Sequence, residues 1–386
     1  MTTIFVAGAL ANKPGNGGEA WVRLSWVVGL RRLGFDVCFV EQLAPEVCVG
    51  PHGTAAPVGD SRNLAYFRHV VDRFGLTSSS SLVYDGGAQV FGMVEDELLA
   101  RAEAAVALIN ISGHLTYEPL MRRCKRKVYV DLDPGFTQYW QAGGRPLGLE
   151  SHDHHFTVGE NVGTAACPIP TGSIRWHPVR QPVLLDEWPV CHDGMPDRFS
   201  TVGSWRGPFG PVTHAERTFG LKVHEFRKFV ELPVRAPGAF EIALDIDPAD
   251  RNDRTLLERH GWKLVNPDRV AGEPDTFRAY VQHSGAEFSV AQGIYVETAS
   301  GWFSDRTARY LAAGKPALVQ DTGFSRNLPT GEGLIAFATM EEAVTGAEEI
   351  VKDYERHSLA ARGLAETFFD SDVVLARLLE AIDVSP

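Results

Sequence analysis

The stretch SGWFSDRTARYLAAGKPALVQDTGF, residues 300–324, predicts a polar loop, a helix, a short strand and a second polar loop in succession. Ser304 is the expected N-cap of a helix over residues 305–313, because its hydroxyl oxygen can accept a hydrogen bond from a free amide of the first turn. Gly314 is expected to end that helix, and an apolar strand is expected over residues 316–320. The stretch therefore indicates one unit of an α/β fold.

The alternation of strands and helices extends upstream of this stretch. The sequence predicts strands over residues 199–204, 240–246, 262–265 and 286–290. Helices are predicted between them, over residues 220–232, 252–260 and 276–283. Alternation of this kind predicts a parallel sheet with helices on both faces. Downstream, residues 339–386 have a mostly helical pattern, with an apolar stripe near the end that suits packing on a domain surface.

A separate α/β series occupies the start of the chain. Its strands are predicted over residues 3–10, 36–43, 81–84, 106–112 and 127–132, and its helices over residues 19–33, 61–74, 95–105 and 117–124. Between the two series, over residues 151–196, a run of prolines interrupts regular elements and indicates a domain connection. We therefore expect an α/β fold with two facing Rossmann-like domains, over residues 1–190 and 191–365.

The composition limits the classes of partner. The 386 residues carry 49 Asp+Glu against 37 Lys+Arg, a formal net charge of −12, which argues against nucleic acid as a partner. No apolar stretch is long enough to span a membrane, and the N-terminus lacks the basic and apolar regions of a signal peptide. Five scattered cysteines without a C-x-x-C pair fit a reduced cytoplasm, where we expect the protein to act.

Two facing α/β domains leave a cleft between the carboxyl ends of their sheets, where ligands bind in such folds. After the first predicted strand, Gly15, Asn16, Gly17 and Gly18 form a glycine-rich turn into a helix. Glycines allow close approach of the backbone, and the amides at the helix start favour an anion, so these residues are a candidate acceptor or phosphate loop. A tight turn without a ligand would need the same residues.

Three residues at the expected cleft are candidates for catalysis: His114, Asp133 and Glu19. His114 follows the fourth predicted strand and suits a general base or a hydrogen-bond donor to a sugar hydroxyl, although a structural role fits equally well. Asp133 alternates with Asp131 after the fifth strand, so both carboxylates are expected on one face, with one of them capping the next helix. We interpret this D-L-D sequence as a strand end and expect no metal.

The start of the helix over residues 305–313 is the expected diphosphate site, because Ser304 and the first-turn amides can bind an anion and Lys222 or Arg306 adds positive charge. The run that contains this helix resembles the nucleotide-sugar site of GT-B glycosyltransferases, whose helix ends in a pattern like A-x-G-x-P-V-[VI]. Residues 311–319, LAAGKPALV, match that ending. The order of the chain is similar too, with a glycine-rich loop after the first strand and a second α/β domain.

The resemblance implies a metal-independent glycosyltransferase of the hexosyltransferase type, with a nucleoside diphosphate sugar as donor, a small-molecule acceptor and no further cofactor. It implies that a C-terminal helix over residues 366–386 crosses back to the N-terminal domain. The residue usage suggests a high-GC bacterium and natural-product biosynthesis. By position, the resemblance implies that the donor lies against Ser204, Trp205, Ser300, Gly301, Ser304, Asp305, Asp321, Thr322 and Gly323. Lys222 and Arg306 are further donor-binding candidates because of their positive charge.

The sequence also departs from the family pattern. The E-x₇-E arrangement is absent, since Thr307 and Arg309 follow Asp305, and asparagines stand where many inverting members have a histidine-rich loop. The catalytic base, the stereochemistry, the sugar and the oligomeric state, including a homodimer, therefore stay open. A non-hydrolysing NDP-sugar epimerase and a non-catalytic nucleotide-binding protein of the same fold are the alternatives, and a dehydrogenase is disfavoured because the G-x-G-x-x-G fingerprint is missing.

Overall fold

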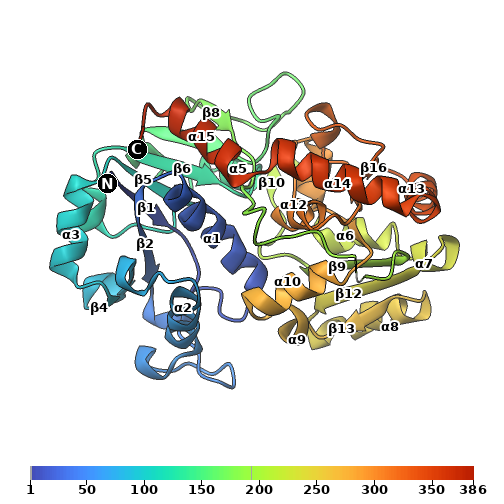
Figure 1. Cartoon of the computed structure of the whole chain (residues 1–386), viewed down its shortest axis with the longest axis horizontal. Helices are drawn as coiled ribbons and strands as arrows, with labels where there is room; N and C mark the ends of the chain where they lie inside the picture. Colours follow the sequence, from blue (N-terminus) through green and yellow to red (C-terminus); the bar gives the residue numbers. More distant parts are fainter. Residues whose placement is uncertain (1, 193) are drawn as a thin grey trace.

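The computed structural model describes residues 2–192 and 194–386, and two α/β domains lie side by side in it (Figure 1). The first domain contains an eight-stranded sheet in the order β4-β3-β2-β1-β5-β6-β7-β8, in which only the β3–β4 pair is antiparallel. Its strands are β1 (Thr3–Ala7), β2 (Asp36–Leu43), β3 (Ser80–Tyr84), β4 (Gln89–Gly92), β5 (Ala107–Ile111), β6 (Lys127–Asp131), β7 (His154–Thr157) and β8 (Trp176–Pro178). Its helices are α1 (Gly17–Arg32), α2 (Arg62–Arg73), α3 (Glu95–Ala104), α4 (Glu118–Met121) and α5 (Phe136–Ala142).

The second domain contains a six-stranded parallel sheet in the order β13-β12-β9-β14-β15-β16. Its strands are β9 (Arg198–Ser204), β12 (Ala239–Asp245), β13 (Lys263–Val265), β14 (Ala286–Ser289), β15 (Ala317–Gln320) and β16 (Leu334–Phe337), and a small hairpin joins β10 (Thr213–His214) to β11 (Arg217–Thr218). Its helices are α6 (Lys222–Arg227), α7 (Leu232–Arg235), α8 (Arg251–Arg259), α9 (Pro267–Ala271), α10 (Pro274–Gln282), α11 (Gly293–Glu297), α12 (Asp305–Ala312) and α13 (Met340–Lys352).

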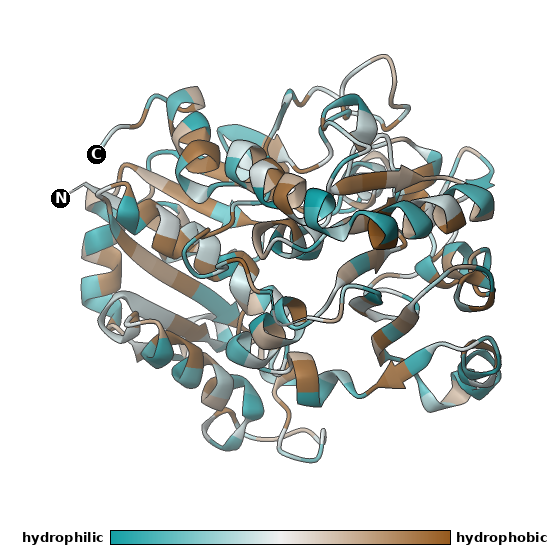
Figure 2. Ribbon diagram, turned by 45° about the vertical axis from the view of Figure 1, so that its right-hand side comes forward, coloured by the Kyte–Doolittle hydropathy of each residue, from teal (hydrophilic) through white to brown (hydrophobic). Residues whose placement is uncertain are grey.

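Both sheets reverse their strand order beside the first strand of the domain. In the first sheet β1 separates β2 from β5, and in the second β9 separates β12 from β14. Loops that leave neighbouring strands in opposite directions open a crevice at such a point, on the carboxyl side of the sheet. Figure 2 shows brown, apolar residues along strands of both sheets, whereas the loops at the carboxyl ends contribute polar residues to this crevice. The expected Rossmann-like domains are therefore present.

The last two helices connect the domains, as expected. Helix α14 (Tyr354–Phe368) packs on α12, and α15 (Ser371–Ala381) continues across to pack on α1 (Figure 1). The crossing point is fixed by backbone hydrogen bonds, since the Val183 amide donates to the Phe369 carbonyl at 2.8 Å and the Ser371 amide donates to the Val183 carbonyl at 2.9 Å. None of the helices in the described ranges is long and apolar enough to cross a membrane.

Several predicted elements have different bounds in the structure. The first strand ends at Ala7 rather than residue 10, because the next residues turn away from the sheet. The helix expected over residues 220–232 is two short helices, α6 and α7. The region 151–196, expected as a domain connection, contributes β7 and β8 to the first sheet. These two strands were missed because they are only four and three residues long.

Helix α1 is buried on most of its circumference, which explains why its sequence is apolar nearly all round. Its first residue, Gly17, lies so close to α10 that a Cβ atom there would overlap the backbone carbonyl of Glu273. The Trp21 indole N–H donates to the Pro274 carbonyl at 2.8 Å, next to that contact. Further along, Gly29 lies against Leu375 of α15. Two glycines thus allow α1 to contact α10 and α15 closely.

We predict that Gly17→Ala lowers the free energy of unfolding by about 1–3 kcal/mol, because α1 and α10 must separate to accommodate the methyl group. Urea denaturation monitored by tryptophan fluorescence measures the change. Gly59→Ala is the control, since nothing lies within 4 Å of a Cβ atom at that residue. Equal stability of the two variants would contradict the close contact between α1 and α10.

Candidate active site

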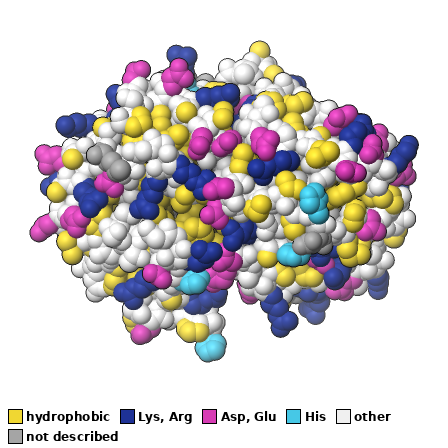
Figure 3. Space-filling model, viewed as in Figure 1, with side chains coloured by type: hydrophobic (Ala, Val, Ile, Leu, Met, Phe, Trp, Pro, Cys, Tyr) yellow, Lys and Arg dark blue, Asp and Glu magenta, His cyan; other side chains and the backbone are white. Residues whose placement is uncertain are grey.

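One cavity of about 1150 Å³ lies between the two domains, at the carboxyl ends of both sheets. Its first-domain wall comes from the loops after β1, β5 and β6, and its second-domain wall from the loops after β9, β12, β13 and β14, together with the start of α12. Figure 3 shows acidic and basic side chains meeting along the boundary between the two halves of the molecule. The position is the one that the strand order of each sheet predicts for a ligand site.

The loop after β1 is held by a carboxylate of the protein itself. The backbone amides of Leu10, Ala11 and Asn12 donate to the buried Glu41 carboxylate at 2.8, 2.6 and 2.8 Å, and the Asn12 side chain donates to it at 2.8 Å. Burial raises the pKa of Glu41, and these donors offset the cost of its charge. This role of Glu41 was not predicted from the sequence. The carboxylate occupies the amides at the start of the loop, which are therefore not available to an external anion.

The glycine-rich turn itself is divided between two roles. Gly15, Asn16 and Gly18 line the cavity, whereas Gly17 packs against α10 and is absent from the lining. The Asn16 side chain caps α1 by accepting from the Glu19 amide at 3.1 Å. Gly17 was predicted to contact the acceptor or a phosphate, but it has a structural role instead. A glycine is required there because α1 and α10 approach each other closely.

Glu19 lines the cavity but is paired with two cations. Its carboxylate contacts Arg23 one turn later on α1 and Lys13 at 3.3 Å. Burial opposes ionisation, but Arg23 and Lys13 outweigh it and lower the pKa of Glu19 to about 2. A carboxylate with so low a pKa is a poor proton acceptor near neutral pH. The geometry thus favours an electrostatic role for Glu19 over the catalytic role predicted from the sequence.

His114 faces the cavity from a tightly constrained loop. The preceding residues, Ser112 and Gly113, have φ angles of 56° and 65°, and serine rarely adopts this left-handed conformation. Asn110 fixes the loop by donating to the Leu115 carbonyl at 2.9 Å and accepting from the Leu115 amide at 3.1 Å. The depth of the cleft and the nearby Arg23 and Lys13 lower the pKa of His114 to about 4. The imidazole is therefore neutral at pH 7 and can accept a hydrogen bond.

The two aspartates after β6 have separate roles, as the sequence allowed. Asp131 is buried and accepts from the hydroxyls of Thr137 and Thr157 at 2.6 and 2.8 Å and from the Gln138 amide at 2.9 Å, so it holds the start of α5. Asp133 lies beyond the end of the strand and lines the cavity. The expectation that both carboxylates share one face is wrong, because the strand ends at Asp131.

Asp133 receives one hydrogen bond from the other domain. The Tyr295 hydroxyl, on α11, donates to the Asp133 carboxylate at 2.9 Å. Burial and the charge of Asp131 raise the pKa of Asp133 to about 6, and the bond from Tyr295 limits the rise. Asp133 is therefore ionised near neutral pH but still basic enough to take a proton, and it is the best-suited base of the three predicted candidates.

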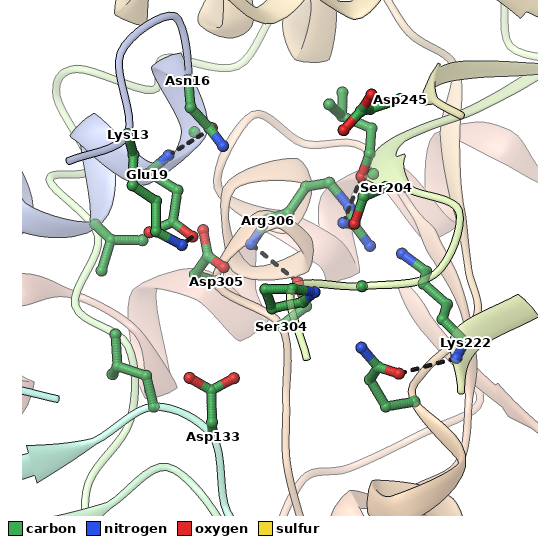
Figure 4. Close-up of a pocket in the computed structure, with 18 of the residues that line it drawn as sticks. Lys13, Asn16, Glu19, Asp133, Ser204, Lys222, Asp245, Ser304, Asp305 and Arg306 are labelled. Atoms are coloured by element: carbon green, nitrogen blue, oxygen red, sulfur yellow. Dashed lines mark hydrogen bonds and ion pairs between the residues drawn. The ribbon is translucent and has the colours of Figure 1, made fainter. Parts of the chain in front are cut away.

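The second-domain wall carries basic and acidic side chains, with Lys222 and Arg306 as well as Asp245 and Asp305. Ser204, Lys222, Ser304, Asp305 and Arg306 all line the cavity, as predicted, and Figure 4 shows them across from Asp133. The Lys222 backbone amide donates to the Gln292 side chain at 2.9 Å, which fixes the first residue of α6. Burial and the positive charge of Arg306 lower the pKa of Lys222 to about 7. A bound anion would restore its full charge.

Helix α12 brings the start of its backbone to the same wall. Ser304 is its N-cap, as predicted, and its hydroxyl accepts from the Arg306 amide at 3.2 Å. The Arg306 guanidinium reaches across the sheet to the Glu287 carboxylate at 2.6 Å, the Val202 carbonyl at 2.7 Å and the Ser289 hydroxyl at 2.8 Å. Because Glu287 balances its charge, Arg306 supports the wall, and Lys222 is the more available cation.

Other residues predicted to bind the donor lie outside the cavity lining: Trp205, Ser300, Gly301, Asp321, Thr322 and Gly323. Trp205 is buried in the core of the second domain, where its indole N–H donates to Asp253 at 2.8 Å. Asp321 accepts from the Gly323 amide at 2.8 Å and the Ser325 hydroxyl at 2.6 Å, and thus closes its own loop.

Apart from Trp302, which lines the cavity, the loops around Ser300 and Thr322 contact the first domain. Asn161 inserts between them: its amide donates to the carbonyls of Ala299 and Gly323 at 2.8 and 3.0 Å. Its backbone amide donates to the Ser300 carbonyl at 3.0 Å, and a Cβ atom on Gly301 would lie 2.9 Å from Asn161. The polar pattern of these loops therefore reflects an interdomain contact.

Sequence reasoning missed a further set of lining residues: Lys13, Arg23, Phe209, Asp245, Gln292 and Tyr295. The sequence did single out Trp140 as an aromatic side chain able to stack on a sugar or a flat acceptor, and this residue also lines the cavity. Asp245 ends β12 and could have been found from its place at a strand end. The others follow no strand directly or sit in elements that were not predicted, such as α11. Among the described residues, no three His, Cys, Asp or Glu side chains gather as they would to hold a metal ion.

No protein-family model and no curated protein matches the chain. Solved structures match it over its whole length. An α-glucosyltransferase in complex with UDP and a 13-mer DNA has 13% identity and a TM-score of 0.60, with 99% of each chain covered. HepE from Anabaena, in complex with UDP-glucose, has 10% identity and a TM-score of 0.60, with 99% of this chain and 100% of HepE covered. AviGT4, a glycosyltransferase involved in avilamycin A biosynthesis, has 11% identity and a TM-score of 0.53, with 99% and 97% covered. These likenesses confirm the expected GT-B fold.

We predict that Tyr295→Phe raises the pKa of Asp133 by about one pH unit, because a hydrogen bond to a charged group is worth about 1.5–3 kcal/mol and each unit corresponds to about 1.4 kcal/mol. The charged groups that face Asp133, namely Asp131, Glu19 and Lys13, are unchanged in this variant. NMR titration of carboxyl-labelled aspartate measures the value.

Tyr354→Phe is the matched control, because the Tyr354 hydroxyl donates to the Gly285 carbonyl in the second domain. This variant should leave the titration of Asp133 as in the unmodified protein. An unchanged pKa in Tyr295→Phe would show that the bond between the domains does not tune Asp133.

Proposed function

Because the chain has the GT-B fold, we propose that it is a glycosyltransferase that moves a sugar from a nucleoside diphosphate sugar to a small-molecule acceptor. A fold alone does not assign a chemistry, so the proposal depends on the site. The observation that carries it is the pairing of two walls across one cavity: Lys222 and the start of α12 on one side, Asp133 on the other. Sugar transfer needs an anion site and a proton acceptor on opposite sides of the reacting carbon.

The diphosphate is proposed to bind at the second-domain wall. The start of α12 offers backbone amides, and Lys222 adds a positive charge beside Gly203, where a Cβ atom would lie 2.7 Å from the Lys222 ammonium nitrogen. The loops after β12 and β13, with Ile246 and Asn266, extend the lining beyond this wall and offer room for the nucleoside. These groups stabilise the negative charge that the leaving diphosphate gains as its bond to the sugar breaks.

The acceptor is proposed to bind at the first-domain wall, with its hydroxyl at Asp133. The ionised carboxylate takes the hydroxyl proton as the oxygen attacks the anomeric carbon, and Tyr295 holds the carboxylate in place. His114 is neutral and is proposed to accept a hydrogen bond from a sugar hydroxyl. Attack from the side opposite the diphosphate would invert the anomeric configuration.

Three further aspects are part of the proposal: metal independence, a small acceptor and a cytoplasmic location. Lys222, Arg306 and the start of α12 can stabilise the charge of the leaving diphosphate, which supports a metal-independent reaction. In addition, both oxygens of Asp131 in the D-L-D sequence accept hydrogen bonds from within the protein, which disfavours Asp131 as a metal ligand. The net charge of −12 favours a small acceptor over a polynucleotide. All five cysteines are free, which fits a reducing cytoplasm.

The test is to incubate the protein with a panel of nucleoside diphosphate sugars and hydroxylated acceptors, and to measure donor binding by calorimetry and products by mass spectrometry. Asp133→Asn should lower turnover by about 10²–10⁴-fold, the usual contribution of a general base, while donor affinity changes little. Asp72→Asn, on the exposed face of α2, is the control and should behave like the unmodified protein.

Three outcomes would contradict the proposal. Formation of an epimerised donor without an acceptor would indicate an epimerase. Binding of a donor without transfer to any acceptor, in the unmodified protein, would indicate a nucleotide-binding protein. Wild-type turnover in Asp133→Asn would remove Asp133 from the reaction.

We predict that the affinity for the donor falls as pH rises from 7 to 9, by up to about tenfold per pH unit. The pKa of Lys222 is about 7 in the empty site, so the lysine loses its proton above that pH, and an anionic diphosphate must then bind together with a proton. Calorimetric titration with a nucleoside diphosphate sugar measures the trend, because its diphosphate does not titrate in this range.

Lys222→Arg should flatten this pH dependence, since arginine stays protonated throughout. Lys228→Arg is the control, because Lys228 is exposed and pairs with Glu225. A donor affinity that is independent of pH in the unmodified protein would show that Lys222 does not bind the diphosphate.

A further inference from the structure

The first-domain end of the cavity is lined by aromatic and apolar side chains that the protein leaves partly uncovered. Trp140, Leu147, Phe209 and Trp302 belong to an apolar cluster that spans both domains, and each is only half-buried. All four line the cavity. Apolar surface that is left open inside a concave site indicates an apolar ligand group.

These rings are held in fixed orientations from both domains. Phe209, from the loop after β9, meets Trp140 of α5 edge to face, with ring centroids 4.9 Å apart and planes at 88°. Phe136 supports Phe209 from behind at 5.0 Å. Trp302 stacks on Tyr295 at 4.6 Å, next to the bond between Tyr295 and Asp133. The rings therefore form a preorganised surface that leads towards the carboxylate.

A cation lies at the edge of this surface. The Arg145 guanidinium sits 4.6 Å above the Trp140 ring, is exposed and lines the cavity. Within residues 2–192 and 194–386, no carboxylate forms an ion pair with it. A guanidinium that is oriented by an aromatic ring and has no acidic partner is well suited to bind a carboxylate in two parallel hydrogen bonds.

The part of the lining that comes from residues 129–147 offers few free polar groups, which argues against a sugar as the acceptor. The Thr137 hydroxyl donates to Asp131, and the remaining lining of residues 129–147 is mostly aromatic or apolar. A sugar acceptor needs several free donors and acceptors for its hydroxyls, because burying them unpaired costs free energy. A flat ring with few polar groups fits the lining better.

We propose that the acceptor is a hydroxylated aromatic acid, whose ring packs against Trp140 and Phe209, whose carboxylate binds Arg145 and whose hydroxyl points to Asp133. This inference rests on the proposed function and names its substrate class. In the reaction the phenolic oxygen forms a bond to the anomeric carbon, its proton passes to Asp133, and the bond between the anomeric carbon and the diphosphate oxygen breaks. The leaving nucleoside diphosphate keeps that electron pair.

The test uses three related compounds: para-hydroxybenzoate, its methyl ester and its ring-saturated counterpart. Each is titrated calorimetrically into the full-length protein with and without UDP. The ester lacks the negative charge and the saturated acid lacks the flat ring. We expect the aromatic acid to bind about tenfold or more tightly than either, since a charge-assisted hydrogen bond and an aromatic contact are each worth about 1 kcal/mol or more.

Three variants separate the contributions of the charge and of the ring. Arg145→Gln should remove the preference for the acid over the ester, and Trp140→Leu should reduce the preference for the aromatic ring, with Trp140→Phe restoring it. UDP affinity should stay within about twofold in all three, because neither Arg145 nor Trp140 is among the groups proposed to bind the diphosphate. Arg123→Gln, on the exposed surface beyond α4, is the control.

The results distinguish this proposal from the proposed function. Equal binding of the three compounds, or no binding of the aromatic acid while UDP still binds, would overturn the acceptor class and leave the donor site intact. Failure of UDP and every other nucleoside diphosphate to bind would overturn the proposed function itself. An unchanged acid preference in Arg145→Gln would remove Arg145 from the acceptor site.

Discussion

The close contact between α1 and α10 is the constraint on which the rest of the molecule depends. Gly17 allows the two backbones to touch, and the bond from Trp21 to the Pro274 carbonyl fixes their register. At its other end α1 packs against α15, so α1 contacts both a helix of the second domain and the last helix of the chain. Since the loop before α1 and the start of α12 both line the cavity, this packing sets the distance between the groups that the two domains contribute.

Charge pairing at the base of the cavity follows from that arrangement. Helix α1 carries the Glu19–Arg23 pair and α12 carries the Asp305–Arg309 pair, each one turn apart. Pairing offsets the cost of burying these charges and leaves them unreactive, since each is held by its partner. Lys222 and Asp133 differ because neither has an ion-pair partner within the described ranges. These two groups, on opposite walls, have pKa values near neutrality and are the ones free to act on a ligand.

The sequence predicted the two α/β domains and the Ser304 cap, because they depend on local periodicity and on a single capping residue. The crossing of the last helix was implied by the resemblance to GT-B glycosyltransferases. It failed where a tertiary contact uses the same residue types as a ligand would. The loops at Ser300 and Thr322 are polar and rich in small residues because they enclose Asn161, and Gly17 is a glycine because of Glu273. Glu41 was overlooked because its place inside a strand gives no hint that its carboxylate organises a distant loop. Tyr295 could not be found, because only the docking of the domains brings it to Asp133.

A crystal structure with an intact nucleoside diphosphate sugar tests the central claim most directly. We expect the diphosphate to lie within hydrogen-bond distance of Lys222 and of the first amides of α12, with the anomeric carbon turned towards Asp133. A diphosphate bound at the glycine-rich loop after β1, or a sugar turned away from Asp133, would contradict this claim.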